Sequence, residues 1–326
     1  MNTEPDFTHA PDPALETVVS DLLQRDPSGE RFAEVYRQTF DQLYDGQRTG
    51  RYKWDQLFKT EKTHYGTLIE INLQRKFGFT DGQLLDYKIA GVEVDCKYSF
   101  RDGGWMLPPE CWGQLVMVSS ASDELSTWSL GVVRASDSHR RTSVNRDGKT
   151  SLSPDGRMAI RWIFRNASFS PNVLLRISDE AIDQVFKAKR GQARLDELFR
   201  RAQEMRIHRN TIATVAQQQD YMKRVRSNGG SRSNLRDEGF LIVGGDYQIH
   251  REIAQSFAVP VPLPGELVSF RVVPTVPGDP LAVSLDGGYW RRADPDELIT
   301  VPAPLLPKPP AVGNAKGGEH FLEGAN

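Results

Sequence analysis

The chain has 326 residues, which is longer than most single hydrophobic cores, so two domains are expected. It contains 38% hydrophobic and 26% charged residues and no apolar run near the roughly 20 residues that cross a bilayer, which excludes a membrane protein and indicates a soluble globular one. The acidic N-terminus lacks the basic start and apolar stretch of a secretory signal, so a cytoplasmic protein is expected. The two cysteines are too few for a disulfide framework and lack zinc-site spacing.

The first half of the chain combines helical and strand-like patterns. Apolar residues recur at helical spacing over 14–45, which predicts two packed helices, and over 60–77, where Gly78 is the expected C-cap. Short β-branched or aromatic stretches follow at 89–100, 115–119, 128–134 and 158–164. This order predicts an α/β or α+β domain over 1–164, with a mixed sheet flanked by helices.

The second half is predicted to be a separate domain. The polar stretch 165–171 ends in Pro and is the candidate linker. Over 172–304 helical signals come first, and short strands with Gly-rich turns follow from Phe240, which predicts a mostly helical domain with short strands. The Pro- and Gly-rich stretch 305–326 is predicted to be a disordered tail.

The charge distribution indicates a nucleic-acid partner. The net charge of −2 argues mildly against one, but between 187 and 236 thirteen Lys and Arg stand against four Asp and Glu. A basic segment inside an acidic chain is typical of a surface that contacts phosphates, although a solvated helical face is the alternative. The candidate nucleic-acid contacts, to DNA or RNA, are Lys189, Arg190, Arg209, Lys223, Arg224, Arg226, Arg232 and Arg236.

The segment 84–99 carries the candidate chemistry. In a strand its apolar residues would face one side, and Glu93, Asp95 and Lys97 would face the other. Asp86 arrives from the preceding strand, so two carboxylates and one ammonium converge. Mg²⁺ takes oxygen ligands, and phosphodiester hydrolysis needs positive charge beside the attacking water and the scissile phosphate. The grouping therefore predicts a Mg²⁺-dependent phosphodiesterase site.

The Asp-x-Lys pattern is weak on its own, since a second instance begins at Asp86. Helical spacing places Glu70 at the border of its helix's apolar stripe and facing inward, which adds a carboxylate to the set. A surface ladder of ion pairs that joins Glu93 and Asp95 to neighbouring lysines remains the alternative.

Glu70 on a helix, followed by Asp86 and then Asp95-x-Lys97, resembles the PD-(D/E)xK nuclease superfamily. The segment LLDYKIAGVEVDCKYS is similar to the NaeI family of type IIE restriction endonucleases. Leu85 stands where the superfamily has Pro, which is not a ligand. The resemblance implies that Asp86, Asp95 and Glu70 coordinate Mg²⁺, and that Lys97 orients or helps to activate the attacking water.

Two further features accompany this segment. Residues 43–46 (LYDG) resemble the K-x-D-G motif of DNA ligases with Leu in place of the nucleophilic Lys, a feature associated with the same family. Because Leu43 cannot carry adenylate, we expect a helix-ending turn here and no nucleotide cofactor. Cys96 faces away from the charged residues and is expected to be a packed core thiol.

The run from Asn210 to Arg236 resembles a helix-turn-helix followed by a wing, with Asn210 as N-cap, and an ordinary basic helical hairpin is the alternative. The family resemblance implies a CAP-type DNA-binding domain that holds a second, effector copy of the recognition duplex, with GCCGGC as the sequence. Cleavage in the first domain would then depend on occupancy of the second. A palindromic site implies a homodimer acting on double-stranded DNA.

Two other functions stay open at this point. A non-enzymatic DNA-binding regulator would use the basic region alone and would bind DNA equally well in EDTA. A repair or recombination nuclease of the same superfamily would select damaged or branched DNA and would give no discrete fragments from intact plasmid.

Overall fold

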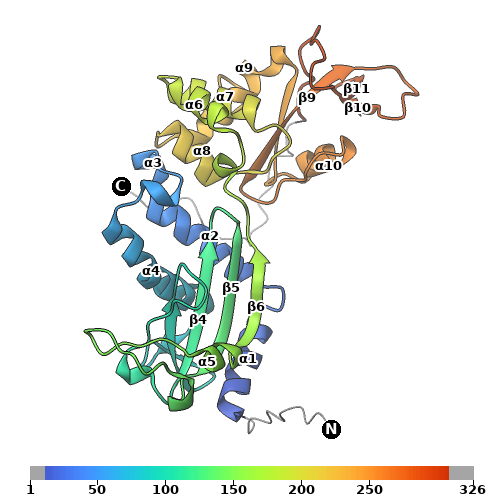
Figure 1. Ribbon diagram of the computed structural model, residues 1–326. Coiled ribbons are helices and arrows are strands. Elements are labelled where there is room, and N and C mark those ends of the chain that lie inside the picture. The colour runs from blue at the N-terminus through green and yellow to red at the C-terminus, as the bar shows by residue number, and fades with distance from the viewer. Residues whose placement is uncertain (1–11, 308–326) are drawn as a thin grey trace, which may run out of the picture. The chain divides into compact units, whose positions relative to one another are not determined.

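The computed structural model describes residues 12–307, and the chain divides into two compact units between Ser178 and Asp179 (Figure 1). The predicted linker 165–171 differs from this division. Its first residues belong to strand β6 (Arg161–Ser168), which is hydrogen-bonded into the sheet of the first unit. Their polarity reflects an exposed edge strand, and the sequence pattern for such a strand resembles that of a loop.

The first unit is built from helices followed by a sheet, in the predicted order. Helices α1 and α2 correspond to the two helices predicted over 14–45, and α4 ends at the expected Gly78, whose φ is 65°. Its helices and strands are α1 (Pro13–Arg25), α2 (Glu30–Tyr44), α3 (Gly46–Thr49), α4 (Lys59–Phe77), β1 (Thr80–Asp81), β2 (Tyr87–Ile89), β3 (Val92–Tyr98), β4 (Leu115–Ser122), β5 (Thr127–Arg134), α5 (Pro154–Met158) and β6. Residues 43–46 form the predicted helix-ending turn, with Asp45 in the left-handed region at φ 46°.

The sheet of the first unit is mixed and follows chain order from β1 to β6. Only β3 and β4 are parallel; the other neighbours are antiparallel. The parallel pair needs a long crossover, which residues 99–114 supply, and its register sets Asp95 beside Val116 and Lys97 beside Val118. The strand predicted over 158–164 begins later, because Met158 ends the short helix α5.

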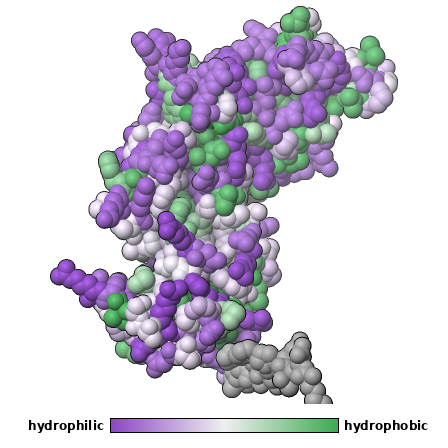
Figure 2. All heavy atoms as spheres, in the orientation of Figure 1, coloured by the Kyte–Doolittle hydropathy of each residue, from purple (hydrophilic) through white to green (hydrophobic). Residues whose placement is uncertain are grey.

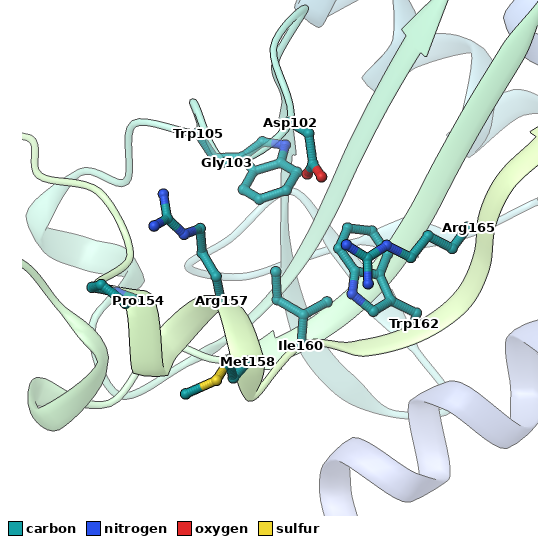
Figure 3. Close-up of a pocket in the computed structure, with 9 residues that line it drawn as sticks. All are labelled: Asp102, Gly103, Trp105, Pro154, Arg157, Met158, Ile160, Trp162 and Arg165. Atoms are coloured by element: carbon teal, nitrogen blue, oxygen red, sulfur yellow. The ribbon is translucent and has the colours of Figure 1, made fainter.

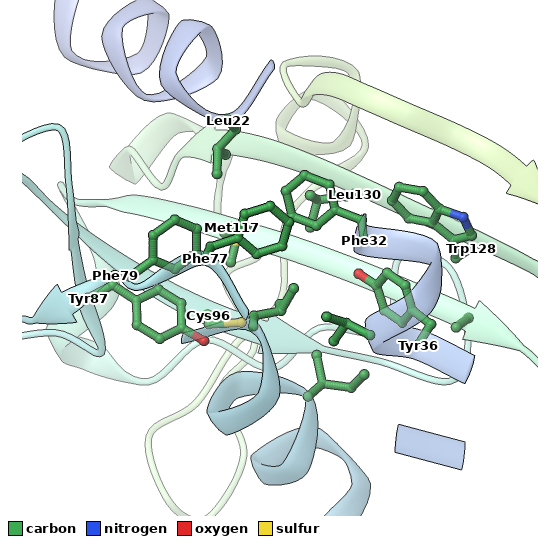
Figure 4. Packing of buried hydrophobic residues seen from close by; sticks show 14 of the residues in the cluster. Leu22, Phe32, Tyr36, Phe77, Phe79, Tyr87, Cys96, Met117, Trp128 and Leu130 are labelled. Carbon is green, nitrogen blue, oxygen red and sulfur yellow. The ribbon is translucent and has the colours of Figure 1, made fainter. Parts of the chain in front are cut away.

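The two faces of this sheet are covered differently. Helices α1, α2 and α4 pack against one face, where aromatic rings dominate the core, as Figure 4 shows around Phe32, Tyr36 and Trp128. Cys96 points into this core and is 4% exposed, which confirms its predicted packing role. The opposite face is covered mainly by loops, and its smaller core includes Trp105 and Cys111. That second face receives Asp95 and Lys97.

The second unit begins with helices and ends in strands, as its sequence pattern predicts. Its helices and strands are α6 (Asp179–Lys187), α7 (Gly191–Arg201), β7 (Ile207–His208), α8 (Arg209–Ala216), α9 (Ser231–Asn234), β8 (Phe240–Gly244), α10 (Gln248–Ser256), β9 (Glu266–Pro274), β10 (Val283–Leu285) and β11 (Gly288–Arg292). Strand β9 lies between β7 and β8 in the sheet and also pairs with β11. The tail predicted from 305 is outside the described residues except for 305–307, where the Leu305 N–H donates to Asp286 Oδ2 at 2.8 Å.

The basic run of the second unit departs from the prediction. Helix α8 is capped by His208, whose ring accepts the Asn210 N–H, so Asn210 lies inside the helix rather than at its N-cap. The chain that follows forms three short pieces instead of one recognition helix: the 3₁₀ turns Tyr221–Val225 and Arg236–Glu238, and α9 between them. Gly229, at φ 74°, interrupts any continuous helix.

Hydrophilic side chains cover much of the visible surface of the second unit (Figure 2). Within residues 12–307, no helix is both long enough and apolar enough to cross a bilayer.

His250 on α10 is a buried titratable group in this second unit. Its Nδ1 accepts the Gly244 N–H at 3.2 Å, and the Arg232 guanidinium lies nearby, donating to Ile242 O at 2.7 Å. Burial, and then the positive charge of Arg232, lower the pKa of His250 to about 4. The folded state therefore holds this ring neutral.

We predict that the second unit loses stability as the pH falls. An unfolded histidine takes up a proton near pH 6.5, whereas folded His250 resists until about pH 4, so the unfolded state binds more protons between these values. Going from pH 7 to pH 5 should cost the wild-type unit about 2 kcal/mol more than the His250→Asn variant. Hydrogen exchange of β8 and β9 amides measures this, and equal losses in both proteins would contradict it.

Candidate active site

The β2–β3 hairpin builds the site. Ala90 and Gly91 both have positive φ, 49° and 81°, which gives the two-residue turn that matches the twist of antiparallel strands. The turn fixes the register, with Tyr87 opposite Val94. Asp86 immediately precedes β2, and the register places it across from Asp95 in the middle of β3. Its Oδ2 accepts the Cys96 backbone N–H at 2.7 Å, which ties the carboxylate to the strand that carries the other charged residues.

Lys97 joins the two aspartates. Its Nζ lies 2.6 Å from Asp95 Oδ2 and 3.6 Å from Asp86 Oδ2, and it donates to Cys96 O at 3.1 Å. The structure thus brings together the predicted Asp86, Asp95 and Lys97. The surface ladder considered from the sequence does not describe these three side chains, because Lys97 and Asp86 are half-buried and Asp95 is only 4% exposed.

Burial and mutual charge set the protonation of this group. Burial raises the pKa of Asp95, while Lys97 and a hydrogen bond with the Cys111 thiol oppose that rise. Burial disfavours the charged form of Lys97, but Asp95 and Asp86 outweigh it and raise the pKa of Lys97 above its usual value. Lys97 is therefore an ammonium at neutral pH.

Glu70 completes the acidic surroundings from α4. Burial is the main cause that raises the pKa of Glu70, and the Asp86 and Asp95 carboxylates add to it while Lys97 opposes them. The predicted inward orientation of Glu70 agrees with this electrostatic coupling. Tyr87 links the helix to the hairpin, since its hydroxyl donates to Glu70 O at 2.7 Å. The sequence pattern did not single out Tyr87, whose aromatic ring reads as an ordinary core residue.

The donor set fits a hard cation. Asp95 Oδ2 is buried and accepts no hydrogen bond of regular geometry, although Lys97 Nζ is its ion-pair partner. Three carboxylates that repel one another beside a single ammonium are the chemistry that favours a divalent ion with oxygen ligands. In the described part of the chain, no three His, Cys, Asp or Glu side chains already have the spacing of a formed metal site.

Glu93 and Cys111 are neighbours of the site that the sequence interpretation left outside it. The Glu93 carboxylate accepts the backbone N–H groups of residues 83–85, which lowers the pKa of Glu93 to about 2, and Lys88 lies 3.4 Å away. Cys111 packs against Asp95 from the crossover between β3 and β4. No local sequence pattern predicts either contact, because each joins residues that come together only when the chain folds.

A pocket of about 640 Å³ opens on the Lys97 face of the same sheet (Figure 3). Trp162 is aligned with Lys97 across the sheet, because Lys97 pairs with Val118, Val118 with Gly131, and Gly131 with Trp162. The Arg165 guanidinium lies 5.1 Å from the centre of the Trp162 ring. The lining residues are Asp102, Gly103, Trp105, Pro154, Arg157, Met158, Ile160, Trp162 and Arg165. None of the four predicted catalytic residues belongs to this pocket, so we assign it no part in the chemistry.

The predicted DNA contacts of the second unit fall into two groups. Three are half-buried and engaged: Arg224 with Asp220 at 3.6 Å, Arg232 with Ile242 O, and Arg236 with Ala303 O at 2.7 Å. The exposed ones are Lys189, Arg190, Arg209, Lys223 and Arg226. The exposed side chains remain candidates for phosphate contact, whereas the other three already have partners within the unit.

The six-stranded sheet with helices on one face, and a hairpin that joins two carboxylates through a lysine, together define a nuclease-like α/β protein. The family model "Restriction endonuclease NaeI" matches residues 16–301. The "Type II restriction enzyme NaeI" of Lentzea aerocolonigenes is 47% identical over 306 residues, which cover 91% of this chain and 96% of that protein. The chain belongs to the NaeI restriction endonuclease family, as the sequence resemblance predicted.

We predict that neither thiol of the folded protein reacts with thiol reagents. Cys96 and Cys111 are both buried, and burial raises the pKa of each thiol, so little reactive thiolate forms. Ellman's reagent should modify less than about a tenth of the thiols in the native protein within minutes. It should titrate both cysteines of the chain after unfolding in guanidinium. Rapid modification of the folded protein would contradict the burial of these side chains.

Proposed function

We propose that this protein is a type II restriction endonuclease that hydrolyses phosphodiester bonds of double-stranded DNA with Mg²⁺. The observation that carries the proposal is the convergence of Asp86, Asp95 and Lys97 on one hairpin. Membership of the NaeI family supports sequence-specific cleavage. The resemblance makes GCCGGC the first sequence to test.

The roles of the residues follow from their chemistry. Asp86 and Asp95, with Glu70, would hold Mg²⁺, which supplies Lewis acidity and lowers the pKa of a bound water. Lys97 is an ammonium in the metal-free protein, because Asp95 and Asp86 raise its pKa, so it can donate a hydrogen bond and positive charge. It would orient the attacking water and stabilise charge that develops on the scissile phosphate. The products would carry 5′-phosphate ends.

We propose further that the second unit binds DNA as a helix-turn-helix domain of CAP type. The arrangement of β7, β9 and β8 beside α7 and α8 supports this proposal, although the third helical element is broken into short turns. The exposed basic side chains would contact phosphates. The unit would hold a second, effector copy of the recognition duplex and so raise cleavage by the first unit, which is the behaviour of a type IIE enzyme.

A homodimer is the assembly that suits this function. A palindromic duplex presents two equivalent strands related by a twofold axis, so two copies of the nuclease site can cut both strands. The two other functions considered from the sequence make different demands: a regulator needs no buried Asp95–Lys97 pair, and a repair nuclease needs no family likeness to restriction enzymes.

We predict metal-dependent cleavage of plasmid DNA into discrete fragments. Mg²⁺ should support cutting at GCCGGC, and EDTA should abolish it, because the carboxylates alone cannot activate water. The Asp95→Asn variant should cut at least about 100-fold more slowly, since it loses charge where the metal would bind. Asp137→Ala, whose side chain is 83% exposed, is the matched control and should cut normally.

The outcomes separate the three functions. Equal binding of DNA with and without EDTA, and no cutting in Mg²⁺, would favour a regulator and contradict the proposal. Cutting of branched substrates alone would favour a repair nuclease.

We predict that the exposed basic residues of the second unit govern effector binding. The double change Lys189→Ala and Arg190→Ala should reduce the slope of log binding constant against log salt by about 1 for each phosphate that the protein no longer neutralises. It should also weaken acceleration of cleavage by a short duplex added in trans. The matched control is Arg200→Ala with Arg201→Ala, because both arginines already pair with Glu197. Equal effects of the two double variants would contradict the assignment.

A further inference from the structure

The loop between β1 and β2 leads directly into Asp86, and one carboxylate holds it. Glu93 lies on β3, across the hairpin from this loop. It accepts the Gln83 N–H at 2.9 and 3.1 Å, the Leu84 N–H at 3.2 Å and the Leu85 N–H at 3.1 Å. Three consecutive backbone amides therefore converge on a single side chain, which is the geometry of an anion-binding nest.

The loop has little room to adopt another conformation around Glu93. The Gly82 N–H donates to Asp86 O at 3.4 Å, which closes the loop onto itself. A Cβ atom at Gly82 would lie 2.1 Å from Leu85 O and 2.7 Å from Glu93 Oε2, so only glycine fits beside the carboxylate. The path of the chain from Gly82 to Asp86 is thus fitted to the position of Glu93.

Asp86 is held from two sides by the same strand. Glu93 fixes the backbone that precedes it, and the Cys96 N–H fixes its carboxylate through Oδ2 at 2.7 Å. Both contacts come from β3, the strand that also carries Asp95 and Lys97. Contacts from β3 therefore fix the position of Asp86 relative to Asp95 and Lys97.

We propose that Glu93 is a positioning residue for the metal site: its carboxylate clamps the loop 82–85 and so holds Asp86 within reach of Lys97 and Asp95. This inference rests on the proposed function, because it concerns the same cation. Loss of the clamp would raise the Mg²⁺ concentration that cleavage needs and would leave metal-free DNA binding unchanged.

The rival explanation is an ordinary surface ion pair. Lys88 is the cross-strand partner of Glu93, and its Nζ lies 3.4 Å from Glu93 Oε1. If this pair alone mattered, removing either partner would have the same consequence. The clamp depends on the three backbone amides and does not need Lys88, so the two explanations differ in what Lys88→Ala does.

The experiment compares full-length wild-type protein with Glu93→Ala, Glu93→Gln, Lys88→Ala and Asp86→Ala. Plasmid cleavage is measured over a range of Mg²⁺ concentrations, together with DNA binding in EDTA and the melting temperature. We expect Glu93→Ala to need on the order of 10-fold more Mg²⁺ for half-maximal rate, as for other residues that orient metal ligands, with partial recovery at high Mg²⁺. Glu93→Gln should need a Mg²⁺ concentration between those of the wild type and Glu93→Ala, because it keeps one acceptor oxygen. Lys88→Ala should stay within about twofold of wild type.

Each result decides between the explanations. Wild-type dependence on Mg²⁺ in Glu93→Ala, or an equal effect of Lys88→Ala, overturns the clamp. If Glu93→Ala fails to fold, Glu93→Gln decides: a folded Gln variant with wild-type Mg²⁺ dependence also overturns it. Asp86→Ala tests the proposed function separately. Cleavage that survives this change contradicts the metal site itself, and the role of Glu93 falls with it. Lost cleavage in Asp86→Ala together with wild-type Mg²⁺ dependence in Glu93→Ala overturns the clamp alone.

Discussion

The site depends on one electrostatic constraint: a single ammonium, Lys97, is held between two carboxylates on the face of a sheet. Asp95 is nearly inaccessible to solvent, and an isolated carboxylate in that position would be costly. The ion pair with Lys97 and the hydrogen bond with the Cys111 thiol stabilise its charged form. Asp86 and Glu70 add negative charge that a single lysine does not balance. The imbalance is what makes a divalent cation the natural complement of this site.

The fold supplies this arrangement through the difference between the two faces of the sheet. Aromatic packing with the helices anchors one face of β3 through Val94 and Cys96. The alternation of a strand then sends Asp95 and Lys97 to the opposite face, where loops rather than helices cover the sheet. Stability and chemistry are thus carried by alternate residues of one strand, so the hydrophobic core sets the positions of the charged side chains.

The sequence predicted this part of the molecule well because its signals are local. The alternation of side chains around Asp95 and the helix end at Gly78 are as predicted, since each depends on neighbours within one element. The failures concern partners distant along the chain. Residues 165–168 of the edge strand β6 resembled a linker because they are mostly polar, and the run from Asn210 to Arg236 resembled a helix-turn-helix with a wing where the chain forms only short turns around Gly229. The loop contacts of Glu93 depend likewise on a hairpin register that composition does not reveal.

Crystals of the protein grown or soaked with Mn²⁺, an anomalous scatterer that replaces Mg²⁺, test the central claim most directly. We predict an anomalous peak about 2.1 Å from oxygens of both Asp86 and Asp95, with Lys97 displaced from between them. A peak elsewhere in the protein, or none at this hairpin at saturating Mn²⁺, would contradict the claim that these carboxylates form a metal site.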